Sequence, residues 1–396
     1  MTGPLHSLKI LDFSTLLPGP CATMMLADMG AEVLRIESPT RLDMLRVMPP
    51  MIGKLSASHA YLNRGKQSLA LDLKKAGAQA VILRLLETHN ILVEQFRPGV
   101  MDRLGLGYEA LRERFPRLIY CSITGYGQTG PLAQRAGHDI NYLALAGVSS
   151  YGGRPQTGPA PQGVQLADVA GGSHHAVMAI LAAVIERQTS GQGQFLDISM
   201  CDAALALNHM TMAGFLAGAP VPGPETELLN GATCYDYFAT ADGRYLAVGA
   251  LEPQFVQGLC EMLDRKDLMS RMLSLKSEDR AFCREQLTGV FQAHPLAHWV
   301  ERLASLDLCI EPVLNFDEVR QHPQFAAREM FCEVPLPDGQ TQTQVTSALK
   351  FSRYPFKAPV AGGALGAETR KVLQQAGYTE VELTELVATG LFGKTL

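Results

Sequence analysis

The chain has 396 residues, of which 47% are hydrophobic and 18% are charged, and its formal net charge is -5 at pH 7. This length favours one large and one smaller domain, and the composition is typical of an α/β enzyme. A negative chain has no general basic field that would attract nucleic acid or a membrane surface, so we expect neither partner.

The cysteines and the apolar segments indicate in which cellular compartment the protein is expected. The 8 cysteines include no Cys-x-x-Cys pair, which argues against a zinc or redox motif and favours free thiols in a reducing compartment. Residues 1–6 show no signal-peptide pattern. The apolar stretch 203–222 is interrupted by Asn208 and His209, and we interpret it as a buried helix rather than a membrane span. We therefore expect a cytoplasmic protein without a metal site.

The first elements predict a strand–helix–strand unit. Residues 8–13 and 32–37 are apolar strands, and Pro18 and Pro20 begin the helix between them, which runs to about Met29. This unit lacks the Gly-x-Gly-x-x-Gly fingerprint, which disfavours a nicotinamide or flavin cofactor.

The β–α alternation continues after an expected loop over residues 38–66. Periodicity predicts further strands at 67–73, 91–94 and 118–124 and helices at 76–88 and 108–115. Because arginines follow several strands, the N-terminal half reads as a parallel sheet with basic residues in its loops.

The stretch from Gly125 to Tyr142 follows an apolar strand. It reads Gly-Tyr-Gly-Gln-Thr-Gly-Pro at 125–131 and Gly-His-Asp-Ile-Asn-Tyr at 137–142. Ligands bind at the carboxyl ends of strands in open α/β sheets, where glycine and proline supply tight turns. His138 is therefore either a general base or a structural histidine.

Asp168 follows the Gly/Pro/Gln-rich loop 155–165 and precedes a long apolar helix expected over 169–187. An aspartate in this place commonly caps the helix, but a helix N-terminus also stabilises a reactive carboxylate or a bound anion. His174 and His175 are adjacent and face different sides of a helix, so we expect them to be structural.

The second half changes composition near residues 222–230 and again near 330. Between these points a hairpin turns at Asp242-Gly243 and helical segments follow. Short strands are then expected around Pro337-Asp338-Gly339. The helices expected after residue 250 are 254–264, 278–292, 296–305, 366–377 and 380–388.

Taken in order, several segments resemble the class III CoA-transferase family, also called CaiB/BaiF. They are Leu-Asp-Phe (11–13), Gly-Pro (19–20), Ala-Asp-Met-Gly-Ala-Glu-Val (27–33), Asn-Arg-Gly-Lys (63–66), Leu-Asp-Leu-Lys (71–74), Phe-Arg-Pro-Gly-Val (96–100), the 125–131 loop, Gly-Gln-Gly-Gln (191–194) and Asp-Gly-Arg-Tyr (242–245).

The resemblance implies an α/β fold with a Rossmann-like parallel-sheet large domain and a smaller α+β domain, in an interlocked homodimer. We assign residues 1–222 to the large CoA-binding domain, 223–330 to the small domain, and 331–396 to a C-terminal segment that packs back on the large domain. The substrate is implied to be an acyl-CoA thioester, with coenzyme A as part of it and no tightly bound cofactor.

Two chemistries occur in the family. The resemblance to its 2-methylacyl-CoA racemases implies that His138 and Asp168 are an acid/base pair and that Glu252 supports His138. The alternative is a CoA-transferase in which Asp168 is the nucleophile. His138 and Leu17 replace a tyrosine and a glutamine of formyl-CoA transferase, so racemisation is our first expectation. A CoA-binding protein without activity is disfavoured because all three residues are present.

The resemblance also implies which residues hold CoA. Arg97 and Arg103 follow a strand end, from which their guanidinium groups can pair with phosphates. Tyr142 either lines the adenine or pantetheine path or belongs to the core, and Asp139 either orients His138 or caps a helix. The expected CoA-binding set is Arg41, Asn63, Arg64, Leu71, Leu73, Arg97, Arg103 and Tyr142.

Overall fold

The computed structural model describes residues 3–274 and 276–395, which form two compact units. The first unit contains the described residues up to Ala146, Gln162–Leu207 and those from Pro323 onward. The second contains Gly147–Pro161 and Asn208–His322. These boundaries differ from those expected at 222 and 330, because a loop before Gln162 joins the second unit and the return to the first occurs earlier.

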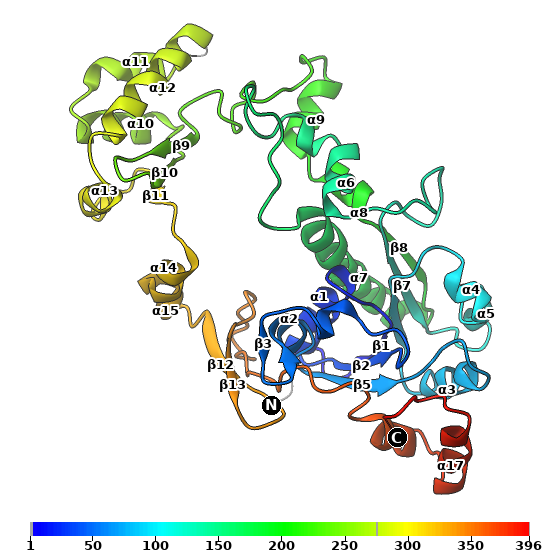
Figure 1. The fold of residues 1–396 in the computed structure, drawn as a ribbon. Coiled ribbons are helices and arrows are strands. Elements are labelled where there is room, and N and C mark those ends of the chain that lie inside the picture. Colours follow the sequence, from blue (N-terminus) through cyan, green and yellow to red (C-terminus); the bar gives the residue numbers. More distant parts are fainter. Residues whose placement is uncertain (1–2, 275, 396) are drawn as a thin grey trace. The chain divides into compact units, whose positions relative to one another are not determined.

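A six-stranded parallel sheet organises the first unit (Figure 1). Because its strands are parallel, their carboxyl ends share one edge, where ligands bind in such sheets. In spatial order the strands are β5 (Lys66–Ala70), β2 (Glu32–Glu37), β1 (Lys9–Asp12), β6 (Ile91–Glu94), β7 (Ile119–Thr124) and β8 (Phe195–Ser199).

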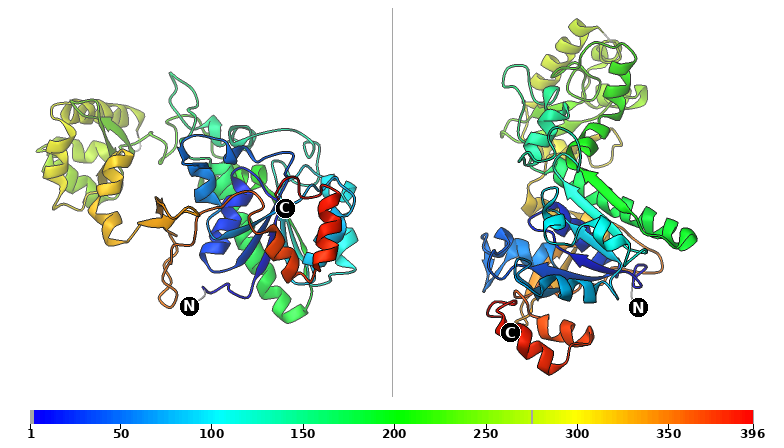
Figure 2. Two further views of the ribbon diagram at one scale, coloured as in Figure 1. Left: turned by 60° about the horizontal axis from the view of Figure 1, so that its bottom comes forward. Right: turned by 90° about the vertical axis from the view of Figure 1, so that its right-hand side faces the viewer.

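Helices cover both faces of this sheet. On one face lie α1 (Pro18–Asp28) and α7 (His175–Ser190), and on the other lie α3 (Ala78–Leu85), α16 (Thr369–Gln375) and α17 (Glu380–Ala388) (Figure 2). Alternate strand residues such as Leu11 and Leu34 are fully buried against the second group. Leu373 of α16 is also fully buried there, which explains why the C-terminal segment belongs to this unit.

Shorter elements complete the first unit. A hairpin forms from β12 (Phe331–Pro335) and β13 (Thr341–Val345) around the expected Pro-Asp-Gly turn. The remaining elements are η1 (Met44–Arg46), β3 (Met51–Ile52), β4 (Leu55–Ser56), α2 (Ala57–Leu62), α4 (Val100–Arg103), α5 (Tyr108–Arg112), α6 (Asp139–Leu145), η3 (Ala167–His174), α8 (Met200–Ala206) and α15 (Pro323–Ala327).

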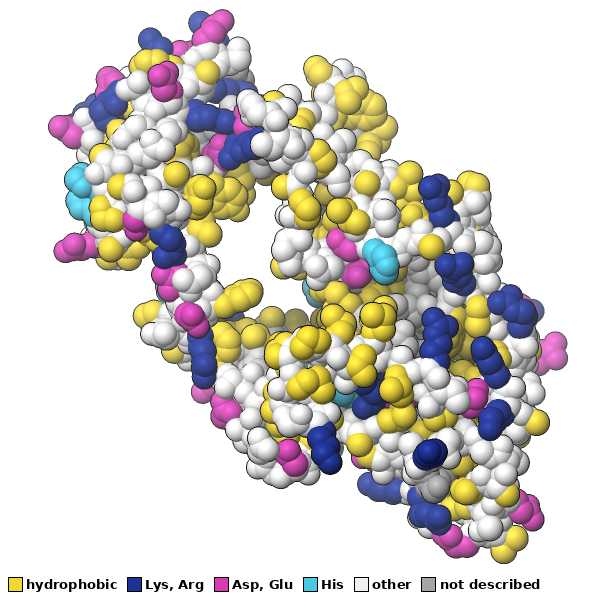
Figure 3. Space-filling model, viewed as in Figure 1, with side chains coloured by type: hydrophobic (Ala, Val, Ile, Leu, Met, Phe, Trp, Pro, Cys, Tyr) yellow, Lys and Arg dark blue, Asp and Glu magenta, His cyan; other side chains and the backbone are white. Residues whose placement is uncertain are grey.

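Two expectations about local structure were wrong. Residues 38–66 are not a simple loop, because they contain η1, β3, β4 and α2. The apolar stretch 203–222 is not one buried helix either. The chain leaves α8 after Ala206, and α9 (His209–Leu216) contains no buried residue. Met210 and Leu216 of α9 are 73% and 75% exposed, and hydrophobic side chains are visible over this helix (Figure 3).

The second unit has an antiparallel sheet of three strands, in the order β11-β10-β9. Helices pack on the sheet around Trp299, which is 1% exposed and donates its indole N–H to the Phe291 carbonyl at 3.0 Å. Its elements are η2 (Val148–Ser150), α9, β9 (Asp236–Ala239), β10 (Tyr245–Val248), α10 (Pro253–Met262), η4 (Lys266–Leu268), α11 (Met269–Met272), α12 (Ser277–Phe291), α13 (Leu296–Leu303), β11 (Ile310–Pro312) and α14 (Phe316–Gln321).

Among the residues described, one continuous helical stretch is long and apolar enough to cross a membrane by length and composition. It spans Ala167–Ser190, which comprises η3 and α7. The stretch contacts α1, β7 and β8, as the core helix of a folded domain also does.

Candidate active site

His138 lies where the loop after β7 turns into α6. It occupies the position before the first helical turn, and its backbone N–H donates a hydrogen bond to Asn141 Oδ1 at 3.0 Å. The residue is exposed. The loop therefore presents an accessible imidazole beyond the carboxyl end of a central strand.

The side chain of Tyr142 packs against this loop. It is 5% exposed, and its hydroxyl donates to the Gly137 carbonyl at 2.6 Å. A Cβ atom on Gly125 or Gly137 would come within 2.6 Å of the Tyr142 ring, so only glycine lets the loop approach so closely. The structure therefore gives Tyr142 a core position, and its hydroxyl is occupied by the backbone beside His138.

Asp168 lies in η3, a π-helical segment that continues into α7. The ring of His175, the residue after this segment, has its Nδ1 2.7 Å from the carbonyl oxygen of Ala170. A Cβ on Gly172 would lie 3.0 Å from Pro18 Cβ, so glycine permits close packing on α1. The helix over 169–187 was expected, but its π-helical start was not. Short π-helical segments are frequently found at functional sites.

Asp139 joins the two segments. Its Oδ1 accepts hydrogen bonds from the backbone N–H groups of Ala167 at 2.7 Å and of Asp168 at 3.1 Å. Of the two roles left open by the sequence, the structure therefore shows Asp139 capping a helix, and the helix is the one that carries Asp168. The sequence gives no signal for this contact, because the residues it joins are nearly thirty positions apart.

The side chain of Asp168 titrates close to neutral pH. Burial raises its pKa to about 6, the nearby charge of Asp139 adds to the increase, and His138 opposes it. A carboxyl group with this pKa exchanges a proton readily near pH 7, which suits general acid/base chemistry. The interaction with His138 also shows that the two expected catalytic side chains lie in one neighbourhood.

Backbone donors at the start of η3 are partly occupied. The N–H of Asp168 is bound to Asp139, and the N–H of Val169 donates to the Gln165 carbonyl at 2.9 Å. These two groups therefore do not form the free donor pair that an enolate oxygen would require.

Glu252 belongs to the second unit. It immediately precedes α10 and is exposed. Its carboxylate lies close enough to the Cys309 thiol to help raise the pKa of that thiol, after the larger effect of desolvation.

Three of the expected CoA-binding arginines are exposed: Arg41, Arg97 and Arg103. Arg41 follows β2 and Arg97 follows β6, so both leave the carboxyl edge of the parallel sheet, on either side of β1. Arg103 Nη1 lies beside Gly99, 3.4 Å from where a Cβ on that glycine would be. The arrangement can offer several guanidinium groups to phosphates at one edge of the sheet.

A buried carboxyl group anchors the Arg97 loop. Glu94 accepts hydrogen bonds from the Ser122 hydroxyl and, at 2.8 Å, from the Phe96 backbone N–H. Burial raises the pKa of Glu94 to about 7. The sequence predicts only that Glu94 belongs to a strand, because nothing local marks which strand residue faces a polar partner.

Other members of the expected CoA set lie inside the first unit. Arg64 is 1% exposed and pairs with Asp28 at 2.6 Å, so its guanidinium holds protein groups instead of a free phosphate site. Asn63 is 2% exposed, and its Oδ1 accepts from Lys66 Nζ at 3.1 Å. Leu71 has no exposed surface, whereas Leu73 is half-buried.

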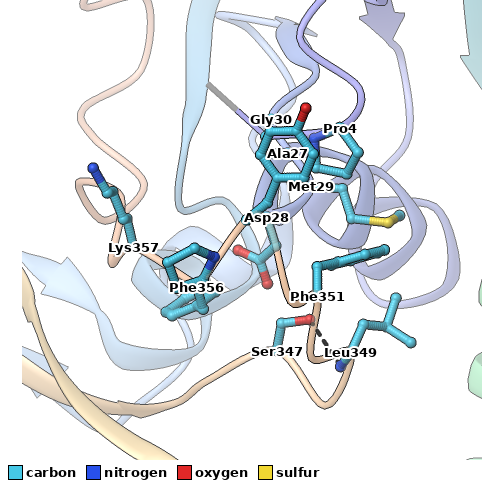
Figure 4. Close-up of a pocket in the computed structure, with 13 residues that line it drawn as sticks. Pro4, Ala27, Asp28, Met29, Gly30, Ser347, Leu349, Phe351, Phe356 and Lys357 are labelled. Atoms are coloured by element: carbon cyan, nitrogen blue, oxygen red, sulfur yellow. Dashed lines mark hydrogen bonds between the residues drawn. The ribbon is translucent and has the colours of Figure 1, made fainter. Parts of the chain in front are cut away.

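A small cavity of about 140 Å³ has Asp28 in its lining (Figure 4). Its walls come from the end of α1 and from the segment 347–357, where Ser347 Oγ accepts from the Leu349 N–H at 3.2 Å. Neither His138 nor Asp168 lines this cavity, so it is separate from the catalytic neighbourhood.

Comparison with known proteins agrees with the resemblance. Residues 5–369 match the model of CoA-transferase family III. The chain is 35% identical to human alpha-methylacyl-CoA racemase over 390 residues, which cover 96% of each chain. It is 31% identical to human succinyl-CoA:glutarate CoA-transferase, over 98% of this chain and 90% of the other.

A solved structure shows the same fold. The crystal structure of a CAIB/BAIF family protein from Brucella suis superposes with a TM-score of 0.81 at 27% sequence identity, covering 95% of this chain and 100% of that one. The parallel sheet, the His138–Asp168 neighbourhood and these matches agree, and the chain is an enzyme of CoA-transferase family III, whose members act on CoA thioesters.

Proposed function

We propose that this enzyme racemises 2-methyl-branched acyl-CoA thioesters. The observation that carries the proposal is the Asp168 carboxyl group beside His138, with a pKa raised to about 6. The 35% identity to human alpha-methylacyl-CoA racemase supports the same reading. Turnover of branched acyl chains would give the enzyme a role in lipid metabolism.

The chemistry needs two groups that exchange protons with the α-carbon. One base removes the α-proton from one face, the thioester carbonyl takes up the charge as an enolate, and the other group returns a proton to the opposite face. With a pKa raised to about 6, Asp168 can act as the base when it is deprotonated and as the acid when it is protonated, and the His138 imidazole provides the second group. Glu252 would hold the imidazole in position.

The second candidate is CoA transfer between carboxylic acids. The similarity to human succinyl-CoA:glutarate CoA-transferase favours it, and the partly accessible Asp168 carboxylate can attack a thioester carbonyl as a nucleophile. In this reaction the α-proton stays in place, which separates the two candidates experimentally.

The deciding experiment uses one enantiomer of 2-methylbutanoyl-CoA in D2O. Racemisation predicts uptake of α-deuterium, followed by NMR, together with loss of enantiomeric purity. General acid/base catalysis contributes roughly a hundred- to ten-thousand-fold per group, so His138→Ala and Asp168→Ala should each lower the rate of α-deuterium exchange by a factor in this range. His174→Ala is the matched control, because His174 is an exposed histidine of the same helical segment.

A different outcome would favour transfer. If no deuterium enters, but a new acyl-CoA forms when succinate is added and this depends on Asp168, the racemase proposal is wrong. Activity of the His138→Ala variant in that assay would show that the histidine is a spectator.

We also propose an interlocked homodimer in the cytoplasm. The exposed apolar residues of α9, including Met210 and Leu216, support an oligomer, since such side chains are unfavourable in water. All 8 cysteines are free, as in a reducing compartment. Light scattering should give twice the chain mass, and Met210→Glu with Leu216→Glu should lower it.

A further inference from the structure

The turn between β1 and α1 has one residue in an unusual backbone conformation. Leu16 has a φ angle of 59°, in the left-handed region that a leucine rarely occupies. A residue keeps such a conformation only where surrounding contacts impose it, and such residues cluster at functional sites. Because the turn follows a strand of the parallel sheet, it lies at the carboxyl edge, where ligands bind.

The carboxylate of Asp43 holds this residue. The N–H of Leu16 donates to both oxygens of Asp43, each at 3.3 Å. Asp43 is itself fixed, because its side chain is 2% exposed, pairs with the buried guanidinium of Arg35 and accepts from the Leu45 N–H at 3.0 Å. Arg35 has a second carboxylate partner in Glu37, at 3.1 Å. Two roles are therefore open to Asp43: it can balance the charge of Arg35, or it can set the conformation of the turn.

The turn leads directly to the segment that carries Asp168. The carbonyl of Pro18 accepts a hydrogen bond from Ser173 Oγ at 2.7 Å, and the same hydroxyl donates to the backbone carbonyl of Asp168 at 3.3 Å, in a three-centre arrangement. Ser173 is fully buried. A chain of contacts thus runs from the Asp43 carboxylate through Leu16 and Pro18 to Ser173 and the backbone of Asp168.

We propose that Asp43 is a positioning residue for Asp168. By holding Leu16 in the left-handed conformation it fixes the Pro18 carbonyl, and this carbonyl fixes Ser173 and the start of η3. The inference rests on the proposed function, because it takes Asp168 as a catalytic group, and it applies to racemisation and to CoA transfer alike.

The first test restores the turn without the carboxylate. Asp43→Ala lets Leu16 relax and should lower kcat for α-deuterium exchange of 2-methylbutanoyl-CoA about ten- to hundredfold, with KM within about threefold, because small displacements of a catalytic group cost this much. Glycine adopts a φ of 59° without a tether. Adding Leu16→Gly to Asp43→Ala should therefore return kcat to within about threefold of the Leu16→Gly variant. A double variant as slow as Asp43→Ala would overturn the proposal.

The matched control is Glu37→Gln. It takes a carboxylate from the same guanidinium but leaves the N–H of Leu16 bound to Asp43. Both Glu37→Gln and Asp43→Ala should lower the melting temperature, because each leaves the buried charge of Arg35 less compensated. Only Asp43→Ala should lower kcat. An equal loss of kcat in the two variants would show that Asp43 balances charge and does not position Asp168.

Ser173→Ala tests the other end of the chain of contacts. It removes no charge, so it keeps the proposal testable if Asp43→Ala does not fold. The variant should lower kcat about tenfold, and Leu16→Gly should not restore it, because the break then lies beyond the turn. A Ser173→Ala enzyme with full kcat would contradict the proposal.

The pH profile separates displacement of Asp168 from a general loss of stability. Burial and the charge of Asp139 raise the pKa of Asp168, and His138 opposes the rise. A loosened η3 admits water, so the pKa of Asp168 should fall. The acidic limb of kcat/KM should then move to lower pH in Asp43→Ala and return in the double variant with Leu16→Gly. A limb at the same pH in all these proteins would contradict a displacement of Asp168.

The two proposals fail differently. If the unmodified enzyme exchanges no α-deuterium, racemisation is wrong, and the same variants are then compared in the Asp168-dependent transfer of CoA to succinate. If the unmodified enzyme is active in either assay but Leu16→Gly does not rescue Asp43→Ala, only the positioning role of Asp43 is wrong.

Discussion

The carboxylate of Asp139 accepts a hydrogen bond from the backbone N–H of Asp168 at 3.1 Å. This contact holds the start of η3 against the start of α6, where His138 precedes the first turn. The same carboxylate adds to the rise in the pKa of Asp168 through its negative charge. Asp139 thus acts on the proposed acid/base pair in two ways, by position and by charge.

Removing the charge of Asp139 should change the pH dependence of catalysis. Asp139→Asn keeps an oxygen that can accept from the two N–H groups but removes the neighbouring negative charge, so the pKa of Asp168 should fall below about 6. The acidic limb of the kcat/KM profile for α-deuterium exchange should therefore move down by roughly 0.5–1 pH unit.

The matched variant for this prediction is Asp139→Ala. It loses the hydrogen-bond acceptor as well, leaves two N–H groups unpaired, and should lower the free energy of unfolding by about 1–3 kcal/mol. An unchanged acidic limb in Asp139→Asn would show that Asp168 does not control the profile.

Asp168 should limit stability at neutral pH. Its folded pKa of about 6 is raised, so its contribution to stability is complete below the unfolded pKa of about 3.9 and is lost as pH rises through 6. Asp168→Asn should therefore raise the free energy of unfolding at pH 7.5 by about 1 kcal/mol, allowing for partial solvent exposure, and change it little at pH 4. Urea denaturation at both pH values measures this.

A surface aspartate provides the comparison. Asp202→Asn removes an exposed charge from the first turn of α8, where a negative charge stabilises the helix. It should lower stability at pH 7.5 by roughly 0.3–1 kcal/mol, a change of opposite sign. If both variants changed the free energy of unfolding at pH 7.5 in the same direction, the proposed destabilisation by the buried charge of Asp168 would be wrong.

The hydroxyl of Tyr142 should stabilise the catalytic loop. Tyr142→Phe removes its 2.6 Å hydrogen bond to the Gly137 carbonyl and leaves that carbonyl without this donor. We expect a loss of about 1 kcal/mol in the free energy of unfolding and a several-fold fall in kcat for exchange. Tyr126→Phe retains the edge-to-face ring contact with Tyr142 and should change stability by less than about 0.5 kcal/mol.

Arg97 and Arg64 should behave differently although both belong to the expected CoA set. Arg97 is exposed, so Arg97→Gln should leave stability unchanged and raise KM for acyl-CoA about tenfold, most strongly at low salt. Arg64 is paired with Asp28 inside the unit, so Arg64→Gln leaves a buried carboxylate uncompensated. Thermal unfolding of Arg64→Gln should show that the free energy of unfolding falls by about 3–5 kcal/mol. The KM for acyl-CoA should be nearly unchanged in the fraction that stays folded.

Local patterns in the sequence were sufficient for the main elements of the first unit. Strand β2 at Glu32–Glu37 and helix α1 at Pro18–Asp28 lie where apolar periodicity and the two prolines predicted them. The prediction of a loop over residues 38–66 was wrong because α2 spans only Ala57–Leu62, too few residues for a helical periodicity to be recognised. The expected burial of α9 was wrong because an apolar composition does not reveal whether another part of the protein covers the helix.

The order of motifs in the sequence was enough to identify the family and to predict His138 and Asp168 as its catalytic pair, since each motif is a local string of side chains. Only the tertiary structure decided which charged groups are free and which are engaged. Arg64 and Arg97 look alike as residues, but one is buried against Asp28 and the other is exposed. Asp139 became a cap for a distant helix, and the pKa of Asp168 rose with burial. Burial and long-range hydrogen bonds depend on which segments meet in the folded chain, and no local pattern encodes that meeting.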